Sequence, residues 1–176
     1  ECEICVQLTI DVSEHQRVTG GLASAENPKN SKLFLEDIWV NAFGTEKDPK
    51  PPWNYYAGAS CKHNLTSPDV KEFGRSIEKK QVWMSNFDLS PIAVECRSLT
   101  QSSTGANTQW NLIGSTHVHR HARGDATTKD GKRIKVAAFL GGYTKELGEL
   151  YAFCLARWLL RTQGKWHEAR PRESVC

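Results

Sequence analysis

Three histidines at alternate positions form the densest group of reactive side chains in the sequence. The run "HVHRH" contains His117, His119 and His121. On an extended strand, alternate residues project to the same face, so the three imidazoles would converge on one ion. Cys96 lies upstream and adds a thiolate, and zinc prefers imidazole and thiolate ligands. These four residues are therefore a candidate zinc site. The alternative is that these histidines face solvent, or contact phosphate alongside Arg120 and Arg123.

The same histidine pattern also suits a second kind of metal chemistry. In some nucleases, two histidines separated by an apolar residue hold a divalent metal, and a helix-borne tyrosine attacks DNA. Tyr143 and Tyr151 follow the histidines, on or beside a predicted helix. A metal-dependent nuclease is therefore an alternative function, although a pattern of three residues occurs often by chance.

The tripeptide Glu26-Asn27-Pro28 follows a short apolar run and has two interpretations. Proline lacks a backbone N–H, so the tripeptide suits a turn that ends a strand. Carboxylate and amide side chains at the end of a strand also suit hydrogen bonding to the edge of a nucleobase.

Positive charge is concentrated in the C-terminal third of the chain. The net charge is +3, yet residues 119–172 contain twelve Lys or Arg against five Asp or Glu. A basic surface favours a polyanionic partner, and we expect nucleic acid, with DNA favoured over RNA. The candidate phosphate-binding residues are Arg120, Arg123, Lys129, Lys132, Arg133 and Lys135. A solvated surface with incidental charge bias is the alternative.

Several function classes lack their sequence motifs. Neither the dinucleotide-binding G-x-G-x-x-G nor the phosphate-binding G-x₄-G-K-[ST] occurs, and G-x-S-x-G is absent too. No apolar run approaches the roughly 20 residues that span a bilayer, so we expect no membrane partner. Six cysteines at irregular spacing are expected to be mostly reduced, which favours an intracellular protein, nuclear in a eukaryote.

The predicted elements give an α/β fold, with α+β as the alternative. We expect a helix over 2–18, a strand over 22–25 and a helix from Ser31 to about Gly44, then a proline-rich loop over 45–53. The loop is a candidate boundary inside a single domain, or domain fragment, that spans 1–176. Short strands are predicted over 53–57, 81–85, 92–96, 110–113 and 134–140, giving a small mixed sheet. A long helix over 144–162, capped by Thr144, closes the chain.

Five segments together resemble the C-terminal portion of DNA cytosine-5 methyltransferase-like domains, including divergent copies in mobile elements. The segments are "SAENPKNSKLF", "ASCKHN", "KKQVWMSNFDL", "HVHRHARG" and "GGYTKELGELY". In such domains a strand ends in Glu-Asn-Val or Glu-Asn-Pro, a variable target-recognition region follows, and a closing helix returns to the catalytic core. The resemblance covers residues 20–158.

The resemblance implies a role for the tripeptide and limits the expected activity. Glu26 would hydrogen-bond the polar edge of a flipped cytosine, while Asn27 and Pro28 would fix the strand end. The family's glycine loop for S-adenosylmethionine and its Pro-Cys nucleophile should precede Glu26, and the sequence contains neither there. We therefore expect the nucleic-acid-binding part of a methyltransferase-like protein, without catalytic activity on its own. S-adenosylmethionine is implied only for a full-length relative. A stand-alone, zinc-assisted nucleic-acid-binding module is the alternative.

Overall fold

The computed structural model describes residues 3–77, 79–94, 96, 119–120, 124–139 and 143–163 of the 176-residue chain. Within these ranges the α-helices are α1 (Glu3–Val18), α2 (Asp37–Phe43), α3 (Val136–Phe139) and α4 (Lys145–Thr162). The 3₁₀ helices are η1 (Lys32–Leu35), η2 (Ser60–His63) and η3 (Ser90–Ile92). The strands are β1 (Ser24–Pro28), β2 (Asn54–Ala59), β3 (Ser76–Ile77), β4 (Lys80–Ser85), β5 (His119–Arg120), β6 (Asp125–Thr127) and β7 (Arg133–Lys135).

A three-stranded sheet in the order β1-β4-β2 forms the centre of the molecule. Both outer strands pair antiparallel with β4, so Trp83 lies opposite Glu26 on one side and opposite Tyr56 on the other. Gln81 to Ser85 are all buried, as expected for a central strand that is covered on both faces.

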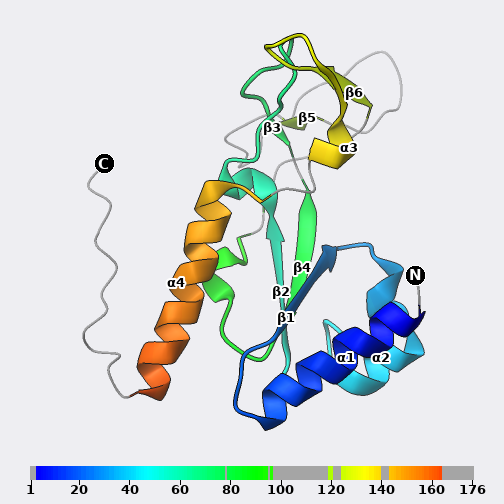
Figure 1. Ribbon diagram of the computed structural model, residues 1–176, viewed down its shortest axis with the longest axis vertical. Helices are drawn as coiled ribbons and strands as arrows, with labels where there is room; N and C mark the ends of the chain where they lie inside the picture. Colours follow the sequence, from blue (N-terminus) through cyan, green and yellow to red (C-terminus); the bar gives the residue numbers. More distant parts are fainter. Residues whose placement is uncertain are drawn as a thin grey trace.

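Helices cover the two faces of this sheet, which gives three layers (Figure 1). Successive strand residues point to opposite faces. Met84 and Tyr55 accordingly pack with residues of α1 and α2, whereas Trp83 and Tyr56 pack with residues of α4. The alternation along β2 and β4 therefore determines which side chains each helix meets.

Aromatic rings dominate the core beneath α1 and α2. The rings of Trp39 and Phe43 meet edge to face at a centroid distance of 4.6 Å, and Phe43 meets Trp53 at 5.0 Å. Trp53 is the last residue of the proline-rich loop, while Trp39 and Phe43 precede the loop. The chain before and after the loop thus contributes to one core.

A second group of short elements, which we name the small lobe, consists of β3, β5, β6, β7 and α3. It lies beyond one end of the central sheet, near the N-terminal end of α4 (Figure 1). β3 and β5 form a parallel pair two residues long, and β6 and β7 form an antiparallel hairpin. Its buried apolar side chains among the described residues are Leu65, Ile77, Ala126 and Val136.

The α/β class and the main elements predicted from the sequence are confirmed. The chain opens with a helix, a strand and a helical segment, and it contains the long C-terminal helix. Thr144 caps that helix, since its side chain accepts a hydrogen bond from Leu147 N at 3.2 Å. The strand predicted at 81–85 is β4. Among the described residues, no helix is long and apolar enough to cross a membrane.

Four local predictions are wrong in detail. The first strand begins and ends later than predicted, at Ser24–Pro28. Proline has no backbone N–H to donate, and the end of an edge strand tolerates this loss. The second helical segment is divided into η1 and α2, because Glu36 has an extended backbone.

The other two errors concern predicted strands. Residues 92–94 and 96 form no strand, since Pro91 favours the turn of η3. The strand predicted over 134–140 ends at Lys135, where α3 begins. The strand predicted over 110–113 lies outside the described residues.

Candidate functional site

The candidate site is a pocket between β1 and the N-terminal half of α4, which we name the Glu26 pocket. Ser24 and Glu26 of β1 and Trp83 of β4 line one side of it. Tyr143 and Tyr151 line the other side, together with Leu147 and Gly148 of α4. Its volume is about 310 Å³. Three aromatic rings and one carboxylate thus surround a cavity that can hold a small planar ligand.

Strand register explains why Glu26 lies in this pocket. Glu26 is directly opposite Trp83, and residues opposite one another in an antiparallel pair project to the same face. Trp83 packs on the α4 side of the sheet and is 3% exposed. Glu26 is therefore directed toward α4 as well.

Two side-chain donors hold the Glu26 carboxylate in place. Gln81 Nε2 donates to Oε1 at 2.8 Å, and the Tyr143 hydroxyl donates to Oε2 at 2.9 Å. Gln81 is almost fully buried, and its amide oxygen accepts a hydrogen bond from the Ser60 hydroxyl. Each carboxylate oxygen has two acceptor positions, so both oxygens retain capacity for a ligand donor.

Tyr143 stays a hydrogen-bond donor over the whole physiological pH range. Burial of its hydroxyl and the adjacent Glu26 carboxylate raise the pKa of Tyr143 to about 12. Tyr143 as a whole is 59% exposed, so it forms the open rim of the pocket. Tyr143 therefore positions the carboxylate and offers an aromatic face to a ligand.

Tyr151 is a packed ring with its hydroxyl at the pocket wall. Its hydroxyl lies 2.5 Å from Ser24 Oγ, and its ring meets Phe87 edge to face at 6.0 Å. The hydroxyls of Tyr143 and Tyr151 thus bond to β1 residues in the Glu26 pocket, whereas His119 lies in β5 of the small lobe. This arrangement gives no support to the His-x-His/Tyr nuclease alternative.

Gly148 keeps the helix side of the pocket open. It lies in the second turn of α4, and a Cβ built on it would meet nothing within 4 Å. Glycine inside a helix costs about 1 kcal/mol relative to alanine. Among the described residues, no packing neighbour requires a glycine here, while a longer side chain would enter the pocket.

Asn27, the other predicted residue of the tripeptide, does not line this pocket. It follows Glu26 on β1 and pairs with Val82, so its side chain projects to the opposite face of the sheet. The structure therefore separates the two residues that the sequence analysis grouped together.

A second cluster combines two of the predicted metal ligands with a cysteine that we did not predict. Potential ligand atoms of Cys61, Cys96 and His119 lie within 4.8 Å of one another. Cys96 Sγ is 3.6 Å from His119 Nε2. Cys61 was missed because it is distant in sequence from both partners. The predicted ligands His117 and His121 lie outside the described residues.

The predicted phosphate-binding residues that are described lie mostly on the β6–β7 hairpin. Arg133 and Lys135 both pair with Asp125, at 2.5 and 2.8 Å. Lys129 Nζ lies over the ring of Phe73, 3.7 Å from its centroid, and Lys132 is exposed. The side chain of Arg120 and all of Arg123 are outside the described part of the chain.

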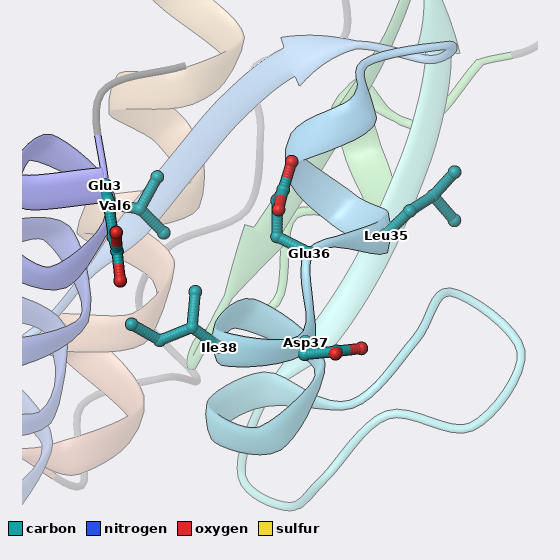
Figure 2. Close-up of a pocket in the computed structure, with 6 residues that line it drawn as sticks. All are labelled: Glu3, Val6, Leu35, Glu36, Asp37 and Ile38. Atoms are coloured by element: carbon teal, nitrogen blue, oxygen red, sulfur yellow. The ribbon is translucent and has the colours of Figure 1, made fainter.

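A larger pocket of about 540 Å³ is lined by residues of α1 and of the η1–α2 segment. Figure 2 shows that Glu3 and Val6 come from α1, and that Leu35 and Asp37 point away from them. Three of its six lining residues are the carboxylates Glu3, Glu36 and Asp37. Such a concentration of negative charge repels phosphate groups, so this pocket does not suit nucleic acid.

Sequence analysis missed several residues of the Glu26 pocket that the fold brings together. Gln81 and Trp83 were predicted only as strand residues, although their alternation in "KQVWMS" places them on one face. Tyr143 was considered only as a nuclease nucleophile.

No protein-family model, curated protein or solved structure matches this chain. The arrangement of its own side chains is therefore the basis for assigning a function.

Proposed function

We propose that this chain is the nucleic-acid-binding part of a DNA cytosine methyltransferase-like protein, and that the Glu26 pocket receives a cytosine turned out of its strand. The observation that carries the proposal is the Glu26 carboxylate, which is fixed by two donors at the wall of an aromatic pocket. The tripeptide that contains Glu26 is the motif on which the family resemblance rests.

The chemistry of the pocket favours cytosine over thymine. Cytosine presents an exocyclic amino group, which donates to a carboxylate, whereas thymine presents a carbonyl oxygen at the same position. The largely exposed Tyr143 offers an aromatic face on which a flipped base stacks, while Trp83 forms a buried part of the pocket wall. A carboxylate that hydrogen-bonds the cytosine ring would also help it accept a nucleophile from another part of the protein.

The surroundings of the pocket are suited to phosphate. The N-terminal end of α4 carries the positive end of the helix dipole, and Tyr143 and Leu147 at this end line the pocket. The small lobe lies near the same end of α4 (Figure 1). Its β6–β7 hairpin contains the predicted phosphate-binding residues Lys129, Lys132 and Lys135. Phosphate contacts there would hold the strand while its base enters the pocket.

This proposal gives the chain a binding role without methyl transfer. Methyl transfer requires a bound cofactor and a thiolate nucleophile. The sequence lacks the family's glycine loop and its Pro-Cys pair. The chain incubated alone with labelled S-adenosylmethionine and DNA should therefore incorporate no label.

The experiment that tests the proposal compares base preference in Glu26→Gln with that in a matched control. Short single-stranded oligonucleotides that differ in one central base, cytosine or thymine, are titrated by fluorescence anisotropy. Glu26→Gln should lose the preference for cytosine, by roughly 5- to 100-fold, because one good base contact contributes ~1–3 kcal/mol of discrimination. Glu36→Gln removes the same charge in the acidic pocket and should keep the preference.

Overall affinity separates base recognition from simple electrostatics. Loss of a negative charge raises affinity for every oligonucleotide alike. If Glu26→Gln, like Glu36→Gln, changes the affinity for the cytosine and thymine oligonucleotides by the same factor, Glu26 does not recognise the base and the proposal fails.

A further inference from the structure

We propose that Cys61, Cys96 and His119 bind a zinc ion that fastens the small lobe to the central sheet. The three residues come from segments that are far apart in the sequence. Cys61 lies in η2, directly after β2, Cys96 follows η3, and His119 begins β5. An ion held by all three would cross-link these segments.

The spacing of the ligand atoms matches tetrahedral zinc. Zinc binds sulfur at about 2.3 Å and imidazole nitrogen at about 2.0–2.1 Å, so a tetrahedral angle separates a sulfur and a nitrogen ligand by about 3.6 Å. Cys96 Sγ and His119 Nε2 are 3.6 Å apart. Tetrahedral zinc also requires its two sulfur ligands to lie about 3.8 Å apart. This distance is compatible with the structure, in which the three ligand atoms all lie within 4.8 Å of one another.

The protein environment favours thiolate ligands at this position. Cys61 and Cys96 are 6% and 9% exposed, and they pack with Ala59. Lys29 and Lys80 line a cavity that Cys96 also lines, and nearby cations favour the thiolate form of cysteine. Two thiolates and a neutral imidazole neutralise Zn²⁺, so the buried site would carry no net charge.

Zinc suits this donor set better than magnesium or calcium does. Soft thiolate ligands select zinc over magnesium or calcium, which prefer oxygen ligands. No disulfide joins Cys61 to Cys96. The described residues supply three ligands, and the fourth position of a tetrahedral ion accepts water or a further ligand.

Within the described residues, the small lobe has a two-residue strand pair and a small apolar core, so a cross-link would stabilise it. β5 pairs with β3 over two residues, Ser76 to His119 and Ile77 to Arg120. A pairing this short is not stable alone in water. Small units with a limited apolar core commonly depend on disulfides or a structural metal. Zinc at His119 would hold β5 against η2.

The site also connects to the Glu26 pocket through one short hydrogen-bond path. Ser60, the neighbour of Cys61, donates to Gln81, and Gln81 donates to Glu26. Fixing η2 by metal would therefore fix the donor that orients Glu26. The metal proposal itself does not require that the pocket bind a base.

Metal analysis of the complete 176-residue chain, purified without a histidine tag, tests the proposal. Elemental analysis should find about one zinc per chain. Replacement of zinc by cobalt should give the intense visible bands of tetrahedral Co²⁺ and a thiolate-to-cobalt charge-transfer band. Cys61→Ser, Cys96→Ser and His119→Ala should each lose most of the zinc.

Control variants remove the same residue types elsewhere. Cys154→Ala removes a buried thiol of α4, and His15→Ala removes an exposed imidazole of α1. Both should retain about one zinc. Because a ligand variant can lose metal through misfolding, the cobalt spectrum of the parent chain is decisive. The proposal is overturned if the parent holds no more zinc than the ligand variants and gives no tetrahedral cobalt spectrum. A Cys61–Cys96 disulfide in freshly purified protein would also overturn it.

Discussion

The central sheet buries large side chains on both faces, whereas the small lobe encloses four small or medium apolar residues among those described. Trp39, Phe43 and Trp53 are at most 2% exposed and contact one another edge to face. In the small lobe, the largest buried side chains are those of Leu65 and Ile77. Apolar burial alone can stabilise the first region, while the proposed zinc cross-link would stabilise the second.

The comparison also separates two parts of the proposed function. The Glu26 pocket is built on the rigid sheet and α4, which suits recognition of a base in a fixed geometry. The small lobe presents exposed cations on a short hairpin, which suits phosphate contacts of looser geometry.

Removal of the proposed zinc should have the largest effect on local stability. It should destabilise the small lobe and leave the central sheet intact. Structural zinc contributes ~10–16 kcal/mol to folding in zinc-finger peptides. Chelation should therefore accelerate hydrogen exchange by more than about 100-fold at Ile77 and Val136, whose amides bond to Leu65 and Gly124. The amide of Met84 in β4 should remain protected. Equal acceleration at all three positions would contradict the division.

Truncation of the sheet core should have the next largest effect. Trp39→Ala removes a ring with no exposed surface and should cost about 3–5 kcal/mol in urea unfolding. Val136→Ala in the small lobe should cost less, because it removes fewer buried atoms. A larger loss of stability in Val136→Ala than in Trp39→Ala would mean that the small lobe, rather than the sheet, dominates folding.

Loss of two hairpin lysines should weaken nucleic-acid binding without altering base preference. Each phosphate contact on single-stranded nucleic acid contributes about −0.7 to the slope of log affinity against log salt. Lys129→Ala with Lys132→Ala should flatten the slope by about 1.4. Lys32→Ala with Lys47→Ala, two exposed lysines outside the lobe, should leave it unchanged. A similar change in both pairs would remove the specific role of the hairpin.

The Gly148→Ala substitution should have the smallest effect on stability, and in the opposite direction. Alanine is a better helix former than glycine, and its Cβ meets nothing within 4 Å, so stability should rise by about 0.5–1 kcal/mol. The helix should also tolerate Gly148→Leu, but the leucine side chain would fill the Glu26 pocket and reduce the preference for cytosine. Unaltered preference in Gly148→Leu, measured by anisotropy, would place the base elsewhere.

Sequence patterns correctly predicted the helices and strands in which local backbone preference and packing in the core favour the same structure. The 3.6-residue periodicity of α4 and the cap at Thr144 define that helix, and the same apolar face packs on the sheet. The short apolar run of β4 between polar turns was equally informative. The strand predicted at residues 92–96 is absent from the described residues there, because Pro91 and the hydrogen bond from Ser90 N to the Asp88 carboxylate favour a turn.

The candidate sites were predicted only in part, because their residues meet through long-range pairing. Glu26 was identified from its tripeptide, but its partners Gln81 and Tyr143 are set by strand register and by the docking of α4. Cys96 and His119 were identified as metal ligands, whereas Cys61 had no local pattern to mark it. Spacing along the chain cannot reveal ligands that separate segments supply.

The most direct test of the central claim is a titration by NMR with a short single strand that contains one cytosine. The indole N–H of Trp83 and the amide of Gly148 report on the Glu26 pocket, while the indoles of Trp39 and Trp53 report on the opposite face of the sheet. The account predicts saturable shifts at Trp83 and Gly148 that require cytosine, and none at Trp39 or Trp53. Shifts confined to the hairpin, or identical shifts with thymine, would contradict it.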